Sequence, residues 1–262
     1  MRSGKPAAAF TVLLVVSFAT MNAKPSDTLL AAMLQEAVLA LVALVAVRFA
    51  VPDALKRCTQ SVQQRNTVRF AGITLLLTGL VGGAITILTW YFANSGNGAG
   101  FVSAVLPSAV DLMENLLLLL GICLLTGLYE ESFMRVLGIE AFERALDTKR
   151  AILASAALFA LLHVGAPDVS AGQLVLLQTA LKFGQALLFG VILGALYVRT
   201  RRLWPCAFIH AGFDVLYLAP NVLLTGMMPE TYASGAVGDT VLLAVSVLML
   251  SGIVLKIRKE IA

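Results

Sequence analysis

The stretch LLTGLYEESFMRVLG, residues 124–138, places two adjacent carboxylates, Glu130 and Glu131, at the end of a long apolar run, with Arg135 four residues further on. Ionisable side chains within or beside a hydrocarbon span are costly, and in membrane proteins they indicate a functional site by default. The alternative is that the two glutamates only cap a helix at the membrane surface. The polar residues elsewhere in the chain bear on this choice.

The composition is that of an integral membrane protein. Hydrophobic residues make up 59% of the 262 residues and charged residues only 13%. Such a chain is too apolar for a soluble domain with a charged surface. The net charge of +4 does not indicate nucleic acid binding, because Lys and Arg are concentrated in alternate loops between the apolar runs, as expected for cytoplasmic loops.

Eight apolar runs predict an all-α fold, a polytopic transmembrane helix bundle with about eight spans. The runs lie at about residues 7–23, 28–49, 70–94, 102–129, 151–166, 172–198, 203–220 and 238–255. The alternation of basic loops predicts that both termini are cytoplasmic. The first run also resembles a signal peptide, because Arg2 and Lys5 precede it, so residues 1–23 are either a retained helix or a cleaved segment.

The chain divides by position along one bundle. Residues 1–100 hold the N-terminal membrane helices, residues 101–220 a core with most of the polar groups at membrane depth, and residues 221–262 a loop and the last membrane helix. The cysteines at positions 58, 123 and 206 are scattered without CxxC spacing. They predict neither a disulfide framework nor a thiolate zinc site, and are interpreted as small buried hydrophobic residues.

Both histidines of the chain lie in apolar runs: His163 in LFALLHVGAP and His210 in AFIHAGFDVLYL. A lone histidine in a membrane helix is usually a packing residue, but His210 is followed four residues later by Asp214. Residues four apart share a helix face. His210 and Asp214 are therefore expected to point into one cavity, and Phe159 to cover His163 in the same way.

Glu131 and Arg135 are also four apart, with the acid first, which is the favourable orientation. We expect Arg135 to neutralise Glu131 and hold the helix end, while Glu130, rotated by about 100°, faces a polar cavity. A partly desolvated carboxylate there can serve as a general base for water. In the predicted topology, Glu130 lies at the cytoplasmic end of its span, whereas His163 lies near the opposite end of another span. A shared site then requires a tilted helix or a site away from its nominal depth.

Other polar or small residues within the predicted spans are interpreted as structural. Gln35 and Glu36 are candidates for lining a path to the site, and Lys182 and Gln185 either face the cavity or snorkel. Gly190 and Gly194 form a small-xxx-small pair, which predicts close helix packing.

Three segments, EESFMR (130–135), FALLH (159–163) and HAGFD (210–214), together resemble the signature of the CPBP family of intramembrane proteases, which includes the CAAX prenyl endopeptidases and the bacterial Abi proteins. Their order, spacing and placement on successive membrane helices match over roughly residues 110–220. The resemblance therefore implies that residues 101–220 form the protease core.

The resemblance implies roles for these residues. Glu130 and His163 would activate the attacking water, with Glu131, Arg135 and Phe159 in support. His210 and the residue at position 214 would stabilise the oxyanion of the tetrahedral intermediate. Some members have Asn at the last position, whose amide donates a hydrogen bond, whereas an ionised Asp214 only accepts. Asp214 is then either protonated or acts by orienting His210.

The expected function is hydrolysis of peptide bonds in membrane-embedded, membrane-associated or lipidated proteins or peptides. A zinc-dependent version would use Glu130, His163 and His210 as ligands, but there is no HExxH pair, and a metal-independent mechanism is favoured. The alternatives from other classes are a non-catalytic membrane scaffold or bacteriocin-immunity protein, and a proton-coupled transporter, for which repeated halves are missing. The expected environment is the lipid bilayer, in a bacterial inner (plasma) membrane, with no nucleic acid partner. The sequence carries no signature of the oligomeric state.

Overall fold

The computed structural model describes residues 4–21, 28–56, 62–95, 107–164, 170–229 and 233–261, and within these ranges every regular element is a helix. The elements in chain order are α1 (Lys5–Met21), α2 (Leu29–Ala50), η1 (Pro52–Leu55), α3 (Val62–Ser95), α4 (Ala109–Glu130), η3 (Glu131–Ile139), α5 (Glu140–Phe142), α6 (Thr148–Val164), α7 (Gln173–Thr200), α8 (Leu203–Thr225) and α9 (Val237–Ile261). The predicted all-α class is confirmed.

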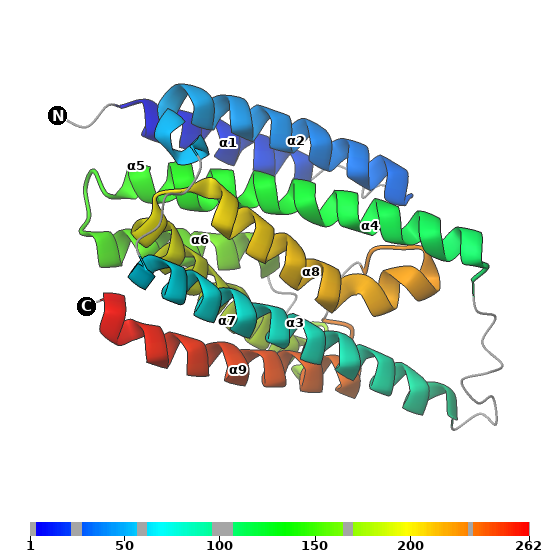
Figure 1. The fold of residues 1–262 in the computed structure, drawn as a ribbon. Coiled ribbons are helices and arrows are strands. Elements are labelled where there is room, and N and C mark those ends of the chain that lie inside the picture. Colours follow the sequence, from blue (N-terminus) through cyan, green and yellow to red (C-terminus); the bar gives the residue numbers. More distant parts are fainter. Residues whose placement is uncertain are drawn as a thin grey trace.

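The long helices lie side by side in one bundle (Figure 1). α4 packs against α2 and α8, α8 packs also against α3, and α7 packs against α6 and α9. The start of α1 and the end of α9 lie at the same end of the bundle. This agrees with termini on one side of the membrane, and the assignment of that side to the cytoplasm stays a prediction.

Six helical segments are long and apolar enough to cross a membrane: Leu29–Ala50, Val68–Thr89, Ala109–Phe142, Gln173–Thr200, Leu203–Thr225 and Val237–Ile257. The remaining two apolar runs form α1 and α6, which have 17 residues each. Each of the eight predicted runs therefore contains a helix, and an integral membrane protein is supported. The count of eight crossings stays a prediction.

The fourth span is longer than the sequence indicated. α4 continues past Glu130 without a break as the π-helix η3 and then as α5, so that one apolar segment extends to Phe142. Every residue of η3 is buried, including Glu131 and Arg135. The expectation that Arg135 holds a helix end is therefore wrong, as is the alternative that the glutamates cap a helix at the membrane surface. Because the two opposite charges neutralise each other, the chain stays helical and buried beyond them.

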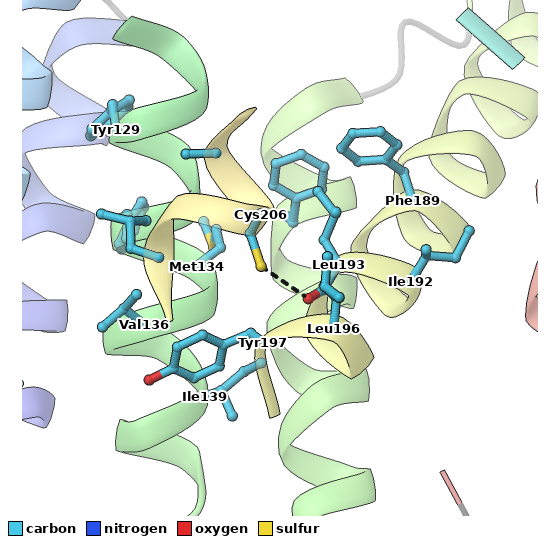
Figure 2. Packing of buried hydrophobic residues seen from close by; sticks show 14 of the residues in the cluster. Tyr129, Met134, Val136, Ile139, Phe189, Ile192, Leu193, Leu196, Tyr197 and Cys206 are labelled. Atoms are coloured by element: carbon cyan, nitrogen blue, oxygen red, sulfur yellow. Dashed lines mark hydrogen bonds between the residues drawn. The ribbon is translucent and has the colours of Figure 1, made fainter. Parts of the chain in front are cut away.

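The core beside the π-helix lies where η3, α7 and α8 meet (Figure 2). π-helical turns are rare and occur frequently at functional sites. Here Ser155 on α6 donates a hydrogen bond of 2.6 Å to the Met134 carbonyl. On the other side of this core, the Sγ atom of Cys206 lies 3.7 Å from the Leu193 carbonyl oxygen (Figure 2). Cys206 and Cys123 are buried, as predicted, and Cys58 lies outside the described residues.

Small residues bring the site helices close together. A Cβ atom at Gly127 on α4 would lie 2.7 Å from the Ala207 carbonyl oxygen on α8. A Cβ atom at Gly190 on α7 would lie 2.9 Å from the Cβ atom of Ala156 on α6, and Gly194 meets the same helix one turn later. The predicted close packing at Gly190 and Gly194 is confirmed, and Gly127 has the same effect one turn before the two glutamates.

Candidate active site

Glu131 is the centre of a buried polar cluster between η3 and α8. Its side chain is 0% exposed, and its Oε2 atom lies 3.1 Å from Nε of Arg135. Its Oε1 atom accepts a hydrogen bond of 2.8 Å from Nδ1 of His210. The pairing of Glu131 with Arg135 was predicted and is confirmed. The bond to His210 was not predicted, because it depends on the close approach of α4 to α8.

Arg135 carries a charge that is held entirely inside the protein. Its side chain is 0% exposed, and its Cζ atom lies 4.3 Å from the centre of the Phe159 ring. Neither terminal nitrogen has a hydrogen-bond partner among the described residues. Glu131 and the face of an aromatic ring therefore provide the compensation for this cation, and removing either leaves it poorly balanced.

Glu130 differs from its neighbour because it reaches open space. Its side chain is 22% exposed, against 0% for Glu131. Its Oε2 atom lies 3.5 Å from Nε2 of His210 and has no hydrogen-bond partner among the described residues. The predicted division between a neutralised Glu131 and a cavity-facing Glu130 is confirmed in its geometry.

Two cavities meet at Glu130 and His163, which are the residues that line both of them in the described part of the chain. The first has a volume of about 220 Å³ and mainly apolar or aromatic walls, formed by Leu39, Tyr129, Phe133, Met134, Phe159 and Leu162. Gln35 and Glu36 also line it, as expected for a path to the site. The second has a volume of about 330 Å³ and more polar walls, which include Thr126, Lys182, His210, Asp214 and Tyr217.

His163 is oriented by its own helix. Its Nδ1 atom lies 2.9 Å from the Phe159 carbonyl oxygen, and because a carbonyl only accepts, Nδ1 carries the proton of this bond. In the neutral ring, Nε2 is then an acceptor. The Phe159 and His163 rings are 4.2 Å apart between centroids, so Phe159 covers His163 as predicted.

The depth conflict expected from the sequence disappears in the structure. Because the fourth span extends to Phe142, Glu130 lies in the interior of a long helical segment and not at its end. Glu130 and His163, near the end of α6, line the same two cavities, and the depth of the site in the membrane stays a prediction.

His210 and Asp214 share one helix face, as predicted. Nε2 of His210 lies 3.4 Å from Oδ2 of Asp214, and both residues line the second cavity. The ring of His210 is also covered by Phe189, at 4.8 Å between centroids. Phe189 was not singled out in the sequence, where one more aromatic residue in an apolar helix carries no signal.

A chain of hydrogen bonds lies on the wall of the second cavity. Nζ of Lys182 donates to Oε1 of Gln185 at 3.1 Å, and Nε2 of Gln185 donates to the Tyr217 hydroxyl at 3.1 Å. Lys182 therefore faces the cavity. Tyr217 was missed, although its position seven residues after His210 puts it on the same face of α8.

The zinc-dependent alternative requires that Glu130, His163 and His210 lie where they could bind one metal ion. Among the described residues, no group of three or more His, Cys, Asp or Glu side chains is arranged to hold a metal ion. Nδ1 of His210 is bonded to Glu131 and Nδ1 of His163 to a carbonyl, which leaves Nε2 of each ring as the atom that could ligate a metal. Glu130, His163 and His210 meet around one cavity, but they do not form a His₂Glu ligand set in this arrangement.

The apolar helices and the buried polar cluster between them define an integral membrane protein with a hydrophilic site inside the bundle. Residues 112–216 match the family model described as type II CAAX prenyl endopeptidase Rce1-like. The matched region contains all the site residues from Glu130 to Asp214, and it confirms the resemblance to the CPBP/CAAX intramembrane protease family. No curated protein matches the sequence. The family model describes a CAAX-type endopeptidase, and the location in a bacterial inner membrane stays a prediction.

Proposed function

We propose that this protein is an intramembrane endopeptidase that hydrolyses peptide bonds of membrane-associated or lipidated proteins or peptides, using a water molecule activated by Glu130 and His163. The observation that carries the proposal is the position of these two residues between the two cavities. Each also has an acceptor group for the water: Glu130 has its carboxylate, in a side chain that is partly exposed, and His163 has Nε2.

In this mechanism the substrate extends through both cavities, with the scissile carbonyl between them. Glu130 takes a proton from the water, and the oxygen of the water bonds to the carbonyl carbon while His163 accepts the second hydrogen bond and orients the water. The intermediate carries a negative oxygen. When the carbon–nitrogen bond breaks, Glu130 returns the proton to the leaving amine, so the carboxylate is regenerated.

His210 is placed to bind the negative oxygen of the intermediate. The bond from Nδ1–H to Glu131 fixes its ring. Nε2 faces the second cavity, and when the ring is the doubly protonated imidazolium, Nε2 carries the N–H group that donates to the oxyanion. Asp214 lies 3.4 Å from the same nitrogen. A carboxylate accepts hydrogen bonds, so this contact supports the interpretation that Asp214 orients His210. Glu131 and Arg135 act through His210 and are positioning residues.

The two cavities also suggest the class of substrate. The apolar and aromatic walls of the first cavity suit an apolar side chain or a lipid-modified segment entering from the bilayer. The polar walls of the second cavity provide hydrogen-bonding partners for water inside the bundle. At membrane depth, such polar groups are tolerated only where they are buried in protein or line a water-filled cavity. Both features favour a substrate that is held at the membrane.

The test is cleavage by the purified full-length protein in liposomes, supplied with membrane peptides that do or do not carry a prenylated cysteine, with products identified by mass spectrometry. We expect cleavage by the wild type and by a Glu114→Gln control, which changes an exposed glutamate of the same helix. Glu130→Gln should cleave at least about 100-fold more slowly than the wild type. If the wild type leaves every peptide intact while Glu130→Gln still protects cells in an immunity assay, the protein is a scaffold or immunity factor.

A further inference from the structure

We propose that Glu36 binds a cationic side chain of the substrate, lysine or arginine, next to the scissile bond, and thereby makes the protein selective for membrane peptides with a basic residue at the cleavage site. This inference rests on the proposed protease function and deepens it, because it assigns the substrate group that the first cavity recognises. Glu36 lies on α2, outside the residues that match the family model.

Glu36 interrupts the inward-facing side of α2. It lies seven residues after Leu29 and seven before Ala43, so it shares their helix face. That face holds the buried residues of the helix, which are Leu29, Leu39, Ala40, Ala43 and Val47. An acidic side chain turned into a membrane bundle is costly and by default belongs to a functional site. The water-activating mechanism does not use this one.

The Glu36 carboxylate is poorly compensated by its surroundings. It lines the first cavity, where none of the described lining residues is Lys or Arg. Thr126 on α4 hydrogen-bonds to the carboxylate, but the Oε2 atom is buried without a hydrogen-bond partner in the described part of the chain. A carboxylate removed from water in this way needs either a proton or a cation.

The rest of the first cavity suits a cation. Glu130 lies close enough to Glu36 for their charges to interact, so the cavity brings two carboxylates together, and a substrate cation reduces the repulsion between them. The rings of Tyr129, Phe133 and Phe159 also line this cavity, and the faces of aromatic rings attract cations. Its apolar walls can pack against the carbon stem of the same lysine or arginine side chain.

The position of Glu36 beside Glu130 limits where the cation lies in the substrate. Glu130 is the residue proposed to activate the water that attacks the scissile carbonyl. A cation held between the two carboxylates therefore belongs to a residue at or next to the scissile bond, because each further residue of an extended chain adds about 3.3 Å. Lys and Arg commonly flank the apolar segments of membrane proteins. The favoured substrate is then cut where an apolar segment meets its first basic residue.

The test is direct binding of Ac-Leu-Lys-Leu-amide to the purified full-length protein in detergent, compared with tripeptides in which norleucine or Nε-acetyl-lysine replaces the lysine. Both ends of these peptides are blocked, so the lysine carries the charge. The wild type should bind the lysine peptide about 10- to 100-fold more tightly than either analogue, as expected for hydrogen bonds to charged groups. Glu36→Gln should lose most of this preference, and Glu36→Asp should keep part of it. Glu114→Gln, the same change at an exposed glutamate, should keep the wild-type preference.

Two outcomes would overturn the inference: equal binding of the three peptides by the wild type, which would mean that Glu36 holds a proton, or an undiminished preference in Glu36→Gln. The first comparison needs no variant, so the test stays decisive if Glu36→Gln does not fold.

Cleavage of membrane peptides that carry lysine or norleucine on either side of the scissile bond separates this inference from the proposed function. Cleavage without a preference for the charged residue would refute the cation site alone. A binding preference that is lost in Glu36→Gln, with no peptide cleaved by the wild type, would support the cation site and refute only the proposed function.

Discussion

Replacing Arg135 with methionine tests whether the buried ion pair holds the site together. Arg135 and Glu131 are both 0% exposed and lie 3.1 Å apart. Removing one partner of a buried pair typically costs about 3–5 kcal/mol, because the other charge stays buried without compensation. The guanidinium also lies 4.3 Å from the Phe159 ring centre. We therefore expect Arg135→Met to lower the free energy of unfolding by an amount toward the upper end of this range.

A second change separates stability from activity. When Glu131 is also replaced by leucine, no charge is left unpaired, and apolar replacements of a buried pair are often neutral or stabilising. His210 still loses the acceptor of its Nδ1 proton, which costs about 1–3 kcal/mol. The double variant should thus regain most of the stability lost in Arg135→Met. It should cleave at least tenfold more slowly than the wild type, because the His210 ring is no longer fixed.

The assay is reversible unfolding in detergent, followed by circular dichroism, together with cleavage of a membrane peptide in liposomes. Arg144→Met is the matched control, because Arg144 is exposed, and it should change the free energy of unfolding by no more than about 0.5 kcal/mol. The reasoning is refuted if Arg135→Met costs less than about 1 kcal/mol, or if adding the Glu131 change makes the protein still less stable.

Three further predictions concern packing, the aromatic cover and metal dependence. Gly127→Val should reduce cleavage at least tenfold, because even a Cβ atom there would lie 2.7 Å from a backbone oxygen of α8 and the site geometry would shift. The control is Gly252→Val, which should retain the wild-type rate because nothing lies within 4 Å of the added Cβ atom. Phe159→Leu should lower the free energy of unfolding by about 1–2 kcal/mol through loss of the contact with Arg135, measured by the same unfolding assay, and no loss of stability would contradict that contact. Treatment with a strong chelator should leave cleavage unchanged, whereas inactivation that added zinc reverses would establish the zinc-dependent version.

The sequence was sufficient for the fold class and for the site residues that lie on one helix. Glu131 and Arg135, Phe159 and His163, and His210 and Asp214 are each four residues apart, and the helical repeat brings the members of each pair together in the structure. The same repeat would have found Tyr217. Apolar runs located the helices because each span needs about 20 apolar residues whatever its neighbours are.

The contacts between helices were not predictable in the same way. The bond between Glu131 and His210 joins residues 79 positions apart, and it exists because Gly127 lets α4 approach α8. The continuation of the fourth span was missed because a glutamate pair and an arginine usually end an apolar run. Their burial depends on mutual neutralisation, which hydropathy does not register. The orientation of Lys182 toward the cavity likewise depends on a contact between helices, because Gln185, which accepts a hydrogen bond from Lys182, donates one to the Tyr217 hydroxyl on α8.

The central claim is that Glu130 and His163 act together on one water molecule, and single-turnover cleavage rates of Glu130→Gln, His163→Gln and the double variant test it most directly. Each single change should slow cleavage by about 10²–10⁴-fold, and the double variant should be about as slow as the slower single variant, because residues that act as a unit are not additive. A Glu130→Gln protein that folds normally and cleaves within tenfold of the wild-type rate would contradict the claim.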